Sequence, residues 1–109
     1  MPWYFYALEL LGGMFLANGV PHFVQGLSGN PLPTPFSKPP GIGDSSPLVN
    51  ALWGLGNLVA GALLLHFFRP QGDAAWSGWI AVGLGVLLLS VQLATHFGKV
   101  RAGKRRSID

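Results

Sequence analysis

Residues 47–68 read PLVNALWGLGNLVAGALLLHFF, and none of them is Asp, Glu, Lys or Arg. As an α-helix, with a rise of about 1.5 Å per residue, this run reaches about 33 Å, which is enough to cross a hydrocarbon core of about 30 Å. Residues 3–25 and 74–97 form two more apolar runs of similar length. Residues 80–89 are apolar around the whole helix and leave no polar face for water. The sequence therefore predicts an all-α membrane protein with three transmembrane helices, at about residues 3–25, 47–68 and 74–97.

The composition agrees with a membrane protein. Hydrophobic residues make up 50% of the 109 residues and charged residues 10%, and the chain contains 16 Gly and 9 Pro. That combination is typical of transmembrane helices. The length allows one domain, so we expect a three-span membrane domain at residues 1–98, with a cytoplasmic Pro-rich loop at 27–46, and a basic cytoplasmic tail at 99–109. The lack of cysteine excludes disulfides, thiolate nucleophiles and Cys-ligated metals.

The basic residues predict which side of the membrane each end faces. Three spans place the first loop and the C-terminus on one side, which then carries Lys38, Lys99, Arg101, Lys104, Arg105 and Arg106. Only Arg69 lies between the second and third runs. Segments rich in Lys and Arg stay in the cytoplasm, so we expect the N-terminus outside and the C-terminus inside. We interpret the basic tail as an anchor for the headgroups of membrane lipids and not as a nucleic-acid site.

The two connections between the runs differ. Residues 69–73, Arg-Pro-Gln-Gly-Asp, allow only a tight reversal, so we expect the second and third helices to form an antiparallel hairpin. The five prolines of residues 27–46 exclude a regular helix and favour an extended, polyproline-like strip at 30–36. Ser46 is the predicted N-cap of the second helix, and Pro47 is its first residue. The apolar side chains of the loop predict that it lies on the helix ends or the membrane surface.

Each predicted helix carries polar or small residues along one face, at about 100° per residue. On the first helix this face consists of Asn18, His22 and Gln25, and Pro21 beside it predicts a kink. On the second helix it consists of Asn50, Gly54, Asn57 and Gly61. On the third helix it consists of Gly78, Ala81, Gly85, Gln92 and His96. Since small residues let helices approach and polar side chains avoid lipid, we expect each face to pack inward.

The polar members of these faces form the candidate site, a predicted cluster in the cytoplasmic half of the bundle: Asn18, His22, Gln25, Asn50, Asn57, Gln92 and His96. One interpretation is structural, because amides within a membrane join helices through hydrogen bonds. Another is a binding site or a proton path, since an ionisable group inside a membrane is a functional candidate. A third is ligation of haem or a metal by His22 and His96, although no spacing motif supports it. We predict no bound metal, no other cofactor and no catalytic residue.

Two ionisable residues, Glu9 and His66, fall in the outer half of the predicted bundle. Glu9 lies about 180° from Asn18 around the helix, so we expect it to face away from the inner cluster. Its carboxylate either bonds to His66 or extends to the membrane interface. We favour the interface.

Between residues 12 and 61 the chain carries several short motifs in an unusual order. They are Asn18-Gly-Val-Pro-His-Phe23, Gly26, Gly29, Pro33-Thr-Pro-Phe36, Pro39-Pro-Gly41, Ser45-Ser-Pro47, Asn50 and Trp53-Gly54. In this order they resemble a family of small bacterial inner-membrane proteins of unknown function. The resemblance implies a three-span protein of the bacterial inner membrane, and it carries over no catalytic residue.

These observations favour a non-enzymatic membrane protein, either an accessory subunit or a binder of a small ligand. Its expected partners are lipids and either further copies of itself or a larger membrane protein, because three helices bury little surface among themselves. The alternatives are an oligomeric transporter of a small solute or protons, and a membrane subunit associated with haem or quinone. An enzyme ranks last, because Asp44 and Asp109 are the only carboxylates expected near the cluster.

Overall fold

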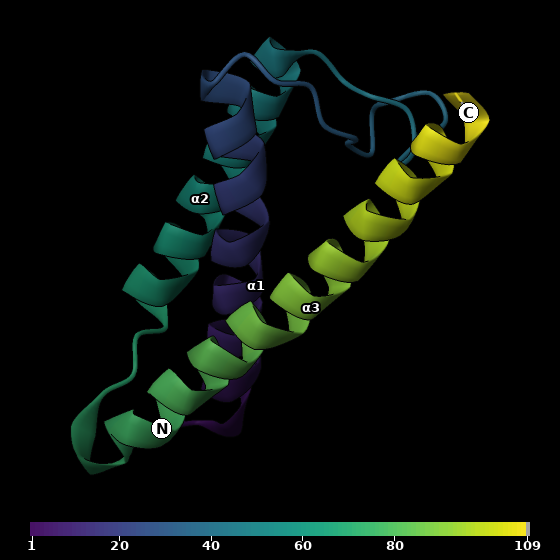
Figure 1. The fold of residues 1–109 in the computed structure, drawn as a ribbon. Helices are drawn as coiled ribbons and strands as arrows, with labels where there is room; N and C mark the ends of the chain where they lie inside the picture. Colours follow the sequence, from purple (N-terminus) through teal and green to yellow (C-terminus); the bar gives the residue numbers. More distant parts are fainter. Residues whose placement is uncertain (109) are drawn as a thin grey trace.

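The computed structural model describes residues 1–108 and consists of three long helices (Figure 1). They are α1 (Trp3–Leu27), α2 (Pro47–Phe67) and α3 (Ala75–Ile108), and a short 3-10 turn, η1 (Gly72–Ala74), precedes α3. Each of the three is long and apolar enough to cross a membrane. The prediction of an all-α protein with three membrane-spanning helices is confirmed, and the chain is a multi-pass membrane protein.

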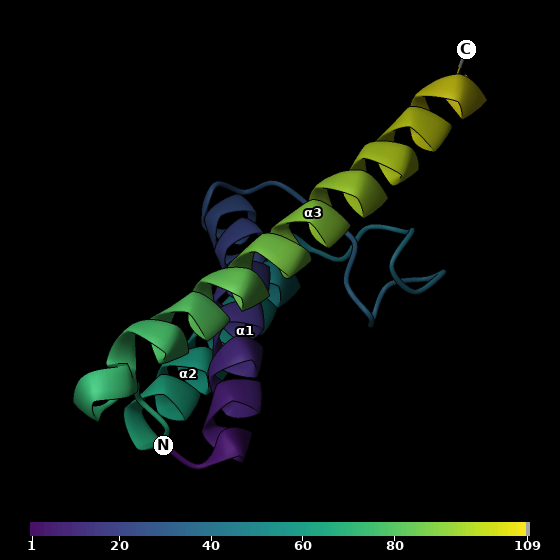
Figure 2. The same cartoon turned by 90° about the horizontal axis from the view of Figure 1, so that it is seen from below.

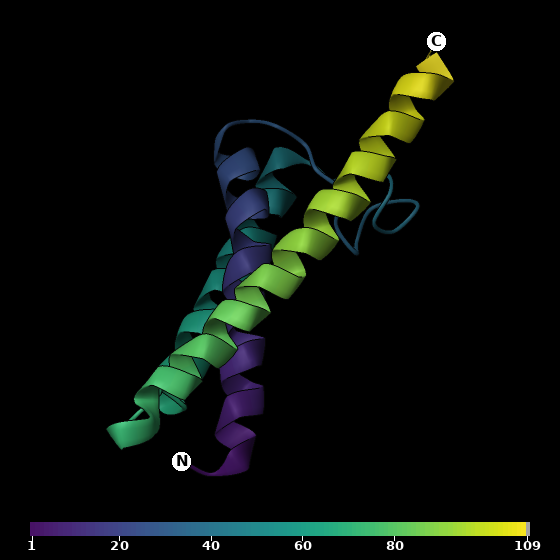
Figure 3. The ribbon, with the colours of Figure 1, turned by 60° about the horizontal axis from the view of Figure 1, so that its bottom comes forward.

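The central helix of the bundle is α1. It packs against both α2 and α3, whereas α2 and α3 do not pack on each other anywhere in residues 1–108. α2 runs beside α1, while α3 crosses α1 and then leans away towards its own C-terminus (Figures 1 and 3). The expected hairpin of the second and third helices is therefore wrong in one respect. The chain does reverse at residues 69–73, but the two helices it joins diverge instead of pairing.

Glycines explain why α1 occupies the centre. A Cβ added at Gly85 of α3 would overlap the carbonyl oxygen of Leu10, and one added at Gly13 of α1 would overlap that of Val82. On the other side, a Cβ at Gly54 of α2 would overlap the α1 backbone. Helices in lipid associate largely through such close packing, because lipid tails are as apolar as the side chains. α1 meets both neighbours at glycine contacts, and α2 and α3 have none with each other.

The face predicted for the second helix is the face that α2 buries. Its buried residues are Asn50, Gly54, Asn57 and Gly61. The alternation of amides with glycines thus marks the side of α2 that meets α1 and the loop, and the apolar remainder of the helix faces outward.

The ends of the helices follow local sequence signals. Ser46 Oγ accepts a hydrogen bond from the backbone N–H of Val49 at 3.2 Å, and Pro47 is the first residue of α2, as predicted. α1 runs through Pro21 without interruption, so the predicted kink does not break the helix.

α3 is longer than the predicted span. The helix does not end near residue 97 but continues through the basic segment to Ile108. Lys and Arg are good helix formers, and their charges are favourable near a helix C-terminus. The predicted tail is therefore the last part of a helix as far as residue 108, and Asp109 lies outside the described residues.

The segment between α1 and α2, residues 28–46, folds back into the wedge between α3 and the α1–α2 pair (Figures 1 and 2). Leu32 pairs with Ser45 in an isolated antiparallel bridge, and the hydroxyls of Thr34 and Ser45 are hydrogen-bonded at 2.5 Å. Thr34 is only 1% exposed. The extended strip predicted for residues 30–36 gives way to a turn at residue 35.

The loop also contacts the end of α2 at which that helix begins. The Phe36 ring meets the Trp53 ring edge-on, with 5.2 Å between centroids, and Trp53 lies about 9 Å inside α2. The loop thus packs on the helix ends, as expected, because it contacts the first turns of α2 and the C-terminal part of α3. Its place relative to the membrane surface stays a prediction.

We predict that a side chain at Gly85 destabilises the bundle while one at Gly83 does not. In the Gly85→Val variant, the new side chain meets the backbone of α1 at Leu10, whereas a Cβ at Gly83 has no neighbour within 4 Å. Overpacking of this kind costs about 1–3 kcal/mol. Thermal unfolding in detergent, followed by circular dichroism, compares the unfolding temperatures of the Gly85→Val and Gly83→Val variants. Equal unfolding temperatures would show that α1 and α3 do not meet at Gly85.

Candidate functional site

Amide side chains join α1 to α2 in the middle of the bundle. Asn18 Nδ2 donates to Asn57 Oδ1 at 2.9 Å, and Asn57 Nδ2 donates to the Trp53 carbonyl at 2.8 Å. Interhelical hydrogen bonds of this kind contribute about 0.6 kcal/mol each. These two members of the predicted cluster therefore point inward and hold helices together.

Asn50 holds both ends of the loop. It is fully buried, and its Nδ2 donates to the carbonyl oxygens of Leu32 at 2.9 Å, Ser45 at 3.2 Å and Ser46 at 3.1 Å. Its Oδ1 lies 2.7 Å from His22 Nδ1. Because Oδ1 can only accept, His22 Nδ1 carries the proton. In the neutral imidazole, His22 Nε2 then has a free lone pair.

His96, the second imidazole of the cluster, bonds to the loop. Its Nε2 lies 2.6 Å from the carbonyl oxygen of Gly41 and donates to it, since a carbonyl only accepts. The Phe97 ring contacts both imidazoles, with centroid separations of 5.9 Å to His22 and 5.6 Å to His96. If both histidines held a haem iron, His96 would have to use Nδ1, because its Nε2 is bonded to Gly41.

A cavity of about 350 Å³ lies between the three helices and the loop. Its helical lining consists of Asn18, His22, Trp53, Leu93, His96 and Phe97, and we call it the histidine pocket. Trp53 Nε1 is buried without a hydrogen-bond partner. His22 Nε2 likewise makes no hydrogen bond to a described residue. The pocket is thus lined by one side chain with an unpaired donor and one with an unpaired acceptor, set among aromatic and aliphatic groups.

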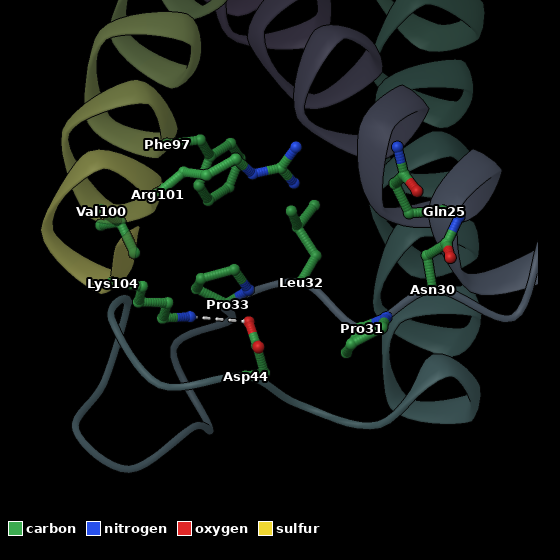
Figure 4. Close-up of a pocket in the computed structure, with 10 residues that line it drawn as sticks. All are labelled: Gln25, Asn30, Pro31, Leu32, Pro33, Asp44, Phe97, Val100, Arg101 and Lys104. Carbon is green, nitrogen blue, oxygen red and sulfur yellow. Dashed lines mark hydrogen bonds and ion pairs between the residues drawn. The ribbon is translucent and has the colours of Figure 1, made fainter. Parts of the chain in front are cut away.

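Two glutamines of the predicted cluster lie elsewhere. Gln25 lines a second cavity nearer the basic residues (Figure 4). Gln92 is exposed on α3 and makes no side-chain hydrogen bond within residues 1–108, so its predicted inward orientation is wrong. Leu93 and Phe97, about 80° and 120° further around the helix than Gly85, face the pocket instead. A helix that crosses its neighbour at an angle keeps its glycine face in contact only near the crossing.

The two ionisable residues of the outer half are not joined. His66 is exposed and contacts the neighbouring Phe67 ring at 5.0 Å. Glu9 is fully buried, and neither carboxylate oxygen has a partner among the described residues. The interface interpretation of Glu9 is wrong, because the missing side chain of Gly78 leaves room for the carboxylate inside the bundle. A Cβ at Gly78 would lie 2.9 Å from Glu9 Oε1.

Three residues of these cavities were not part of the predicted cluster: Trp53, Phe97 and Arg101. Trp53 follows Asn50 by three positions and precedes Asn57 by four, so it borders the amide face of α2. This spacing is the feature of the sequence that could have placed Trp53 beside the predicted cluster. Phe97 and Arg101 gain their roles from the loop that packs against α3, and no local pattern of the sequence indicates that contact.

No protein-family model matches the chain, and neither a curated protein nor a solved structure matches it. The resemblance of residues 12–61 to a bacterial inner-membrane family therefore stays a prediction, and the geometry of the cavities carries the functional argument.

We predict that Asn50→Leu releases the loop. The leucine removes the hydrogen bonds to three loop carbonyls and to His22, so the bridge between Leu32 and Ser45 loses its support. Hydrogen–deuterium exchange of residues 31–46 should become at least about tenfold faster, as expected for local opening.

Asn57→Leu is the matched control. It removes a buried amide of the same helix that bonds only within and between α1 and α2. Exchange of the loop should stay near the wild-type rate in this variant. Equal acceleration in both variants would contradict the role of Asn50.

Proposed function

We propose that the protein is a non-enzymatic membrane protein that binds a small amphipathic ligand in the histidine pocket. The observation that carries the proposal is the pair of unpaired groups, His22 Nε2 and Trp53 Nε1, on residues that line one cavity. A volume of about 350 Å³ lies at the small end of the range for ligand sites. Buried polar groups are normally paired, and Trp53 Nε1 is buried without a partner, so a ligand in this cavity would supply a partner to it as well as to His22 Nε2.

The two groups specify the chemistry of that ligand. It must donate a hydrogen bond to His22 Nε2 and, once the Trp53 side chain turns to bring its buried N–H to the cavity, accept one from the indole, and a hydroxyl group does both. Phe97 and Leu93 offer apolar contacts to a ring or a short chain. A phenol or quinol has these features, which supports the quinone-associated alternative above haem, because one imidazole nitrogen of His96 is already used by Gly41.

Packing supports binding over transport through a single copy. Between the histidine pocket and Glu9, the α1 and α3 backbones meet at Gly13 and Gly85. On the α2 side, a Cβ at Gly61 would lie 2.8 Å from the Leu16 side chain. A continuous polar path would have to pass these contacts.

We also propose a location and partners for the protein. It belongs to the bacterial inner membrane with its C-terminus in the cytoplasm, as the distribution of Lys and Arg favours. It acts there as an accessory subunit, alongside further copies of itself or a larger membrane protein. The exposed Gln92 amide supports such a partner, since an amide within a membrane gains a hydrogen bond when another helix covers it.

The binding proposal predicts saturable binding of tetramethylhydroquinone to the detergent-solubilised protein, measured by isothermal titration calorimetry. Its dimethyl ether, which lacks the O–H donor for His22, should bind at least about tenfold more weakly. Trp53→Phe keeps the ring that contacts Phe36 but removes the N–H, so it should also weaken binding about tenfold.

Trp79→Phe provides the control, because Trp79 is exposed and does not line the pocket. It should bind the quinol like the wild type. The proposal fails if the quinol does not bind saturably, or if the Trp53 and Trp79 variants bind it equally well.

The orientation predicts a positive signal from each of two reporter fusions. A fluorescent protein fused after Asp109 should fluoresce, and alkaline phosphatase fused after Gly72 should be active, because the first folds in the cytoplasm and the second outside it. Whole-cell fluorescence and phosphatase assays measure both. The reverse pattern would place the C-terminus outside.

A further inference from the structure

A second cavity, of about 460 Å³, opens between α1, the loop and the C-terminal part of α3 (Figure 4). Its polar lining consists of Gln25, Asn30, Asp44, Arg101 and Lys104, while Leu32 and Phe97 are among its apolar residues, and we call it the arginine pocket. In Figure 4 the guanidinium of Arg101 extends from α3 towards Leu32, and the amides of Gln25 and Asn30 stand on the opposite wall. The guanidinium and the two amides thus lie on opposite sides of the cavity.

The charge of the arginine pocket is positive. Lys104 Nζ forms an ion pair with Asp44 Oδ1 at 2.9 Å, which ties the loop to α3. Arg101 makes no ion pair or hydrogen bond with another described residue. A guanidinium presents five N–H donors in a planar fork that fits the oxygens of a phosphate. The pocket therefore offers a phosphate one cation whose donors are unused.

An apolar groove continues from this pocket into the membrane domain. A smaller cavity of about 260 Å³ shares Gln25, Leu32, Phe97 and Arg101 with it and extends between Pro21 of α1 and Gly98 of α3. Beyond Gln25 and Arg101 its lining has no polar side chain. A cationic opening that leads into an apolar groove matches a molecule with an anionic head and a hydrocarbon chain.

We propose that the arginine pocket binds the phosphate of an anionic phospholipid, with Arg101 as the phosphate-contacting residue. An acyl chain of the lipid then occupies the groove between Pro21 and Gly98. Free phosphate could bind to Arg101 in the same way, but it would leave the groove empty. We therefore assign the phosphate group to a lipid. Basic pockets beside transmembrane helices are common sites for anionic headgroups. This site is distinct from the histidine pocket, although Phe97 lines both.

The test measures binding of lipid to the full-length protein in detergent by native mass spectrometry. Phosphatidylglycerol, phosphatidylcholine and inorganic phosphate are added in separate arms. We expect phosphatidylglycerol to bind at least about tenfold more tightly than phosphatidylcholine, whose choline cation is repelled by the unpaired charge of Arg101. Arg101→Gln should weaken binding of phosphatidylglycerol about tenfold, and Arg101→Lys should weaken it less, because it keeps the charge but loses the fork.

Arg105→Gln is the matched control, because Arg105 is an exposed cation of the same helix and does not line the pocket. It should retain wild-type binding, and thermal unfolding checks that all variants fold. Equal loss in the Arg101→Gln and Arg105→Gln variants would overturn the proposal, since only diffuse charge would then attract the lipid. Saturable binding of inorganic phosphate that needs Arg101, without preference for phosphatidylglycerol, would overturn the lipid assignment.

Discussion

The amide of Asn50 is the interaction on which the rest of the structure depends. It is fully buried, it bonds to His22 of α1, and it holds carbonyls from both ends of the loop. Leu32 and Ser45 are buried within the protein, so their carbonyl oxygens need a protein donor in place of water. One side chain therefore fixes the loop against α1 and α2, and at the same time determines which nitrogen of His22 carries the proton.

The second constraint is the central position of α1. Glycine contacts bring it against both neighbours, and α3 crosses it at an angle that leaves a wedge at the end where the loop lies (Figure 3). The loop occupies that wedge and joins α3 through the bond from His96 to Gly41 and the ion pair of Lys104 with Asp44. Both pockets are consequences of this arrangement, because an irregular loop fills the space less completely than a helix.

The two pockets differ in the chemistry they can recognise. The histidine pocket combines the imidazole of His22, the Trp53 side chain and aromatic walls, and the ligand we propose for it is a small hydroxyl-bearing ring. The arginine pocket presents a cation at the opening of an apolar groove, and this suits a lipid headgroup. Phe97 lines both, so a ligand in one pocket lies against the wall of the other. Buried Glu9, far along α1 from both, takes no part in either site.

The sequence by itself determined the three helices, the inward face of α2 and the capping of α2 by Ser46, because each of these depends on length, helical period or a contact within four residues. It also identified Asn18, His22, Asn50, Asn57 and His96 as residues with partners inside the protein. Only the tertiary structure decided that Gln92 is exposed, that Glu9 is buried, and that the loop enters the wedge. Helical period shows which residues share a face, but what covers that face depends on where separate helices cross.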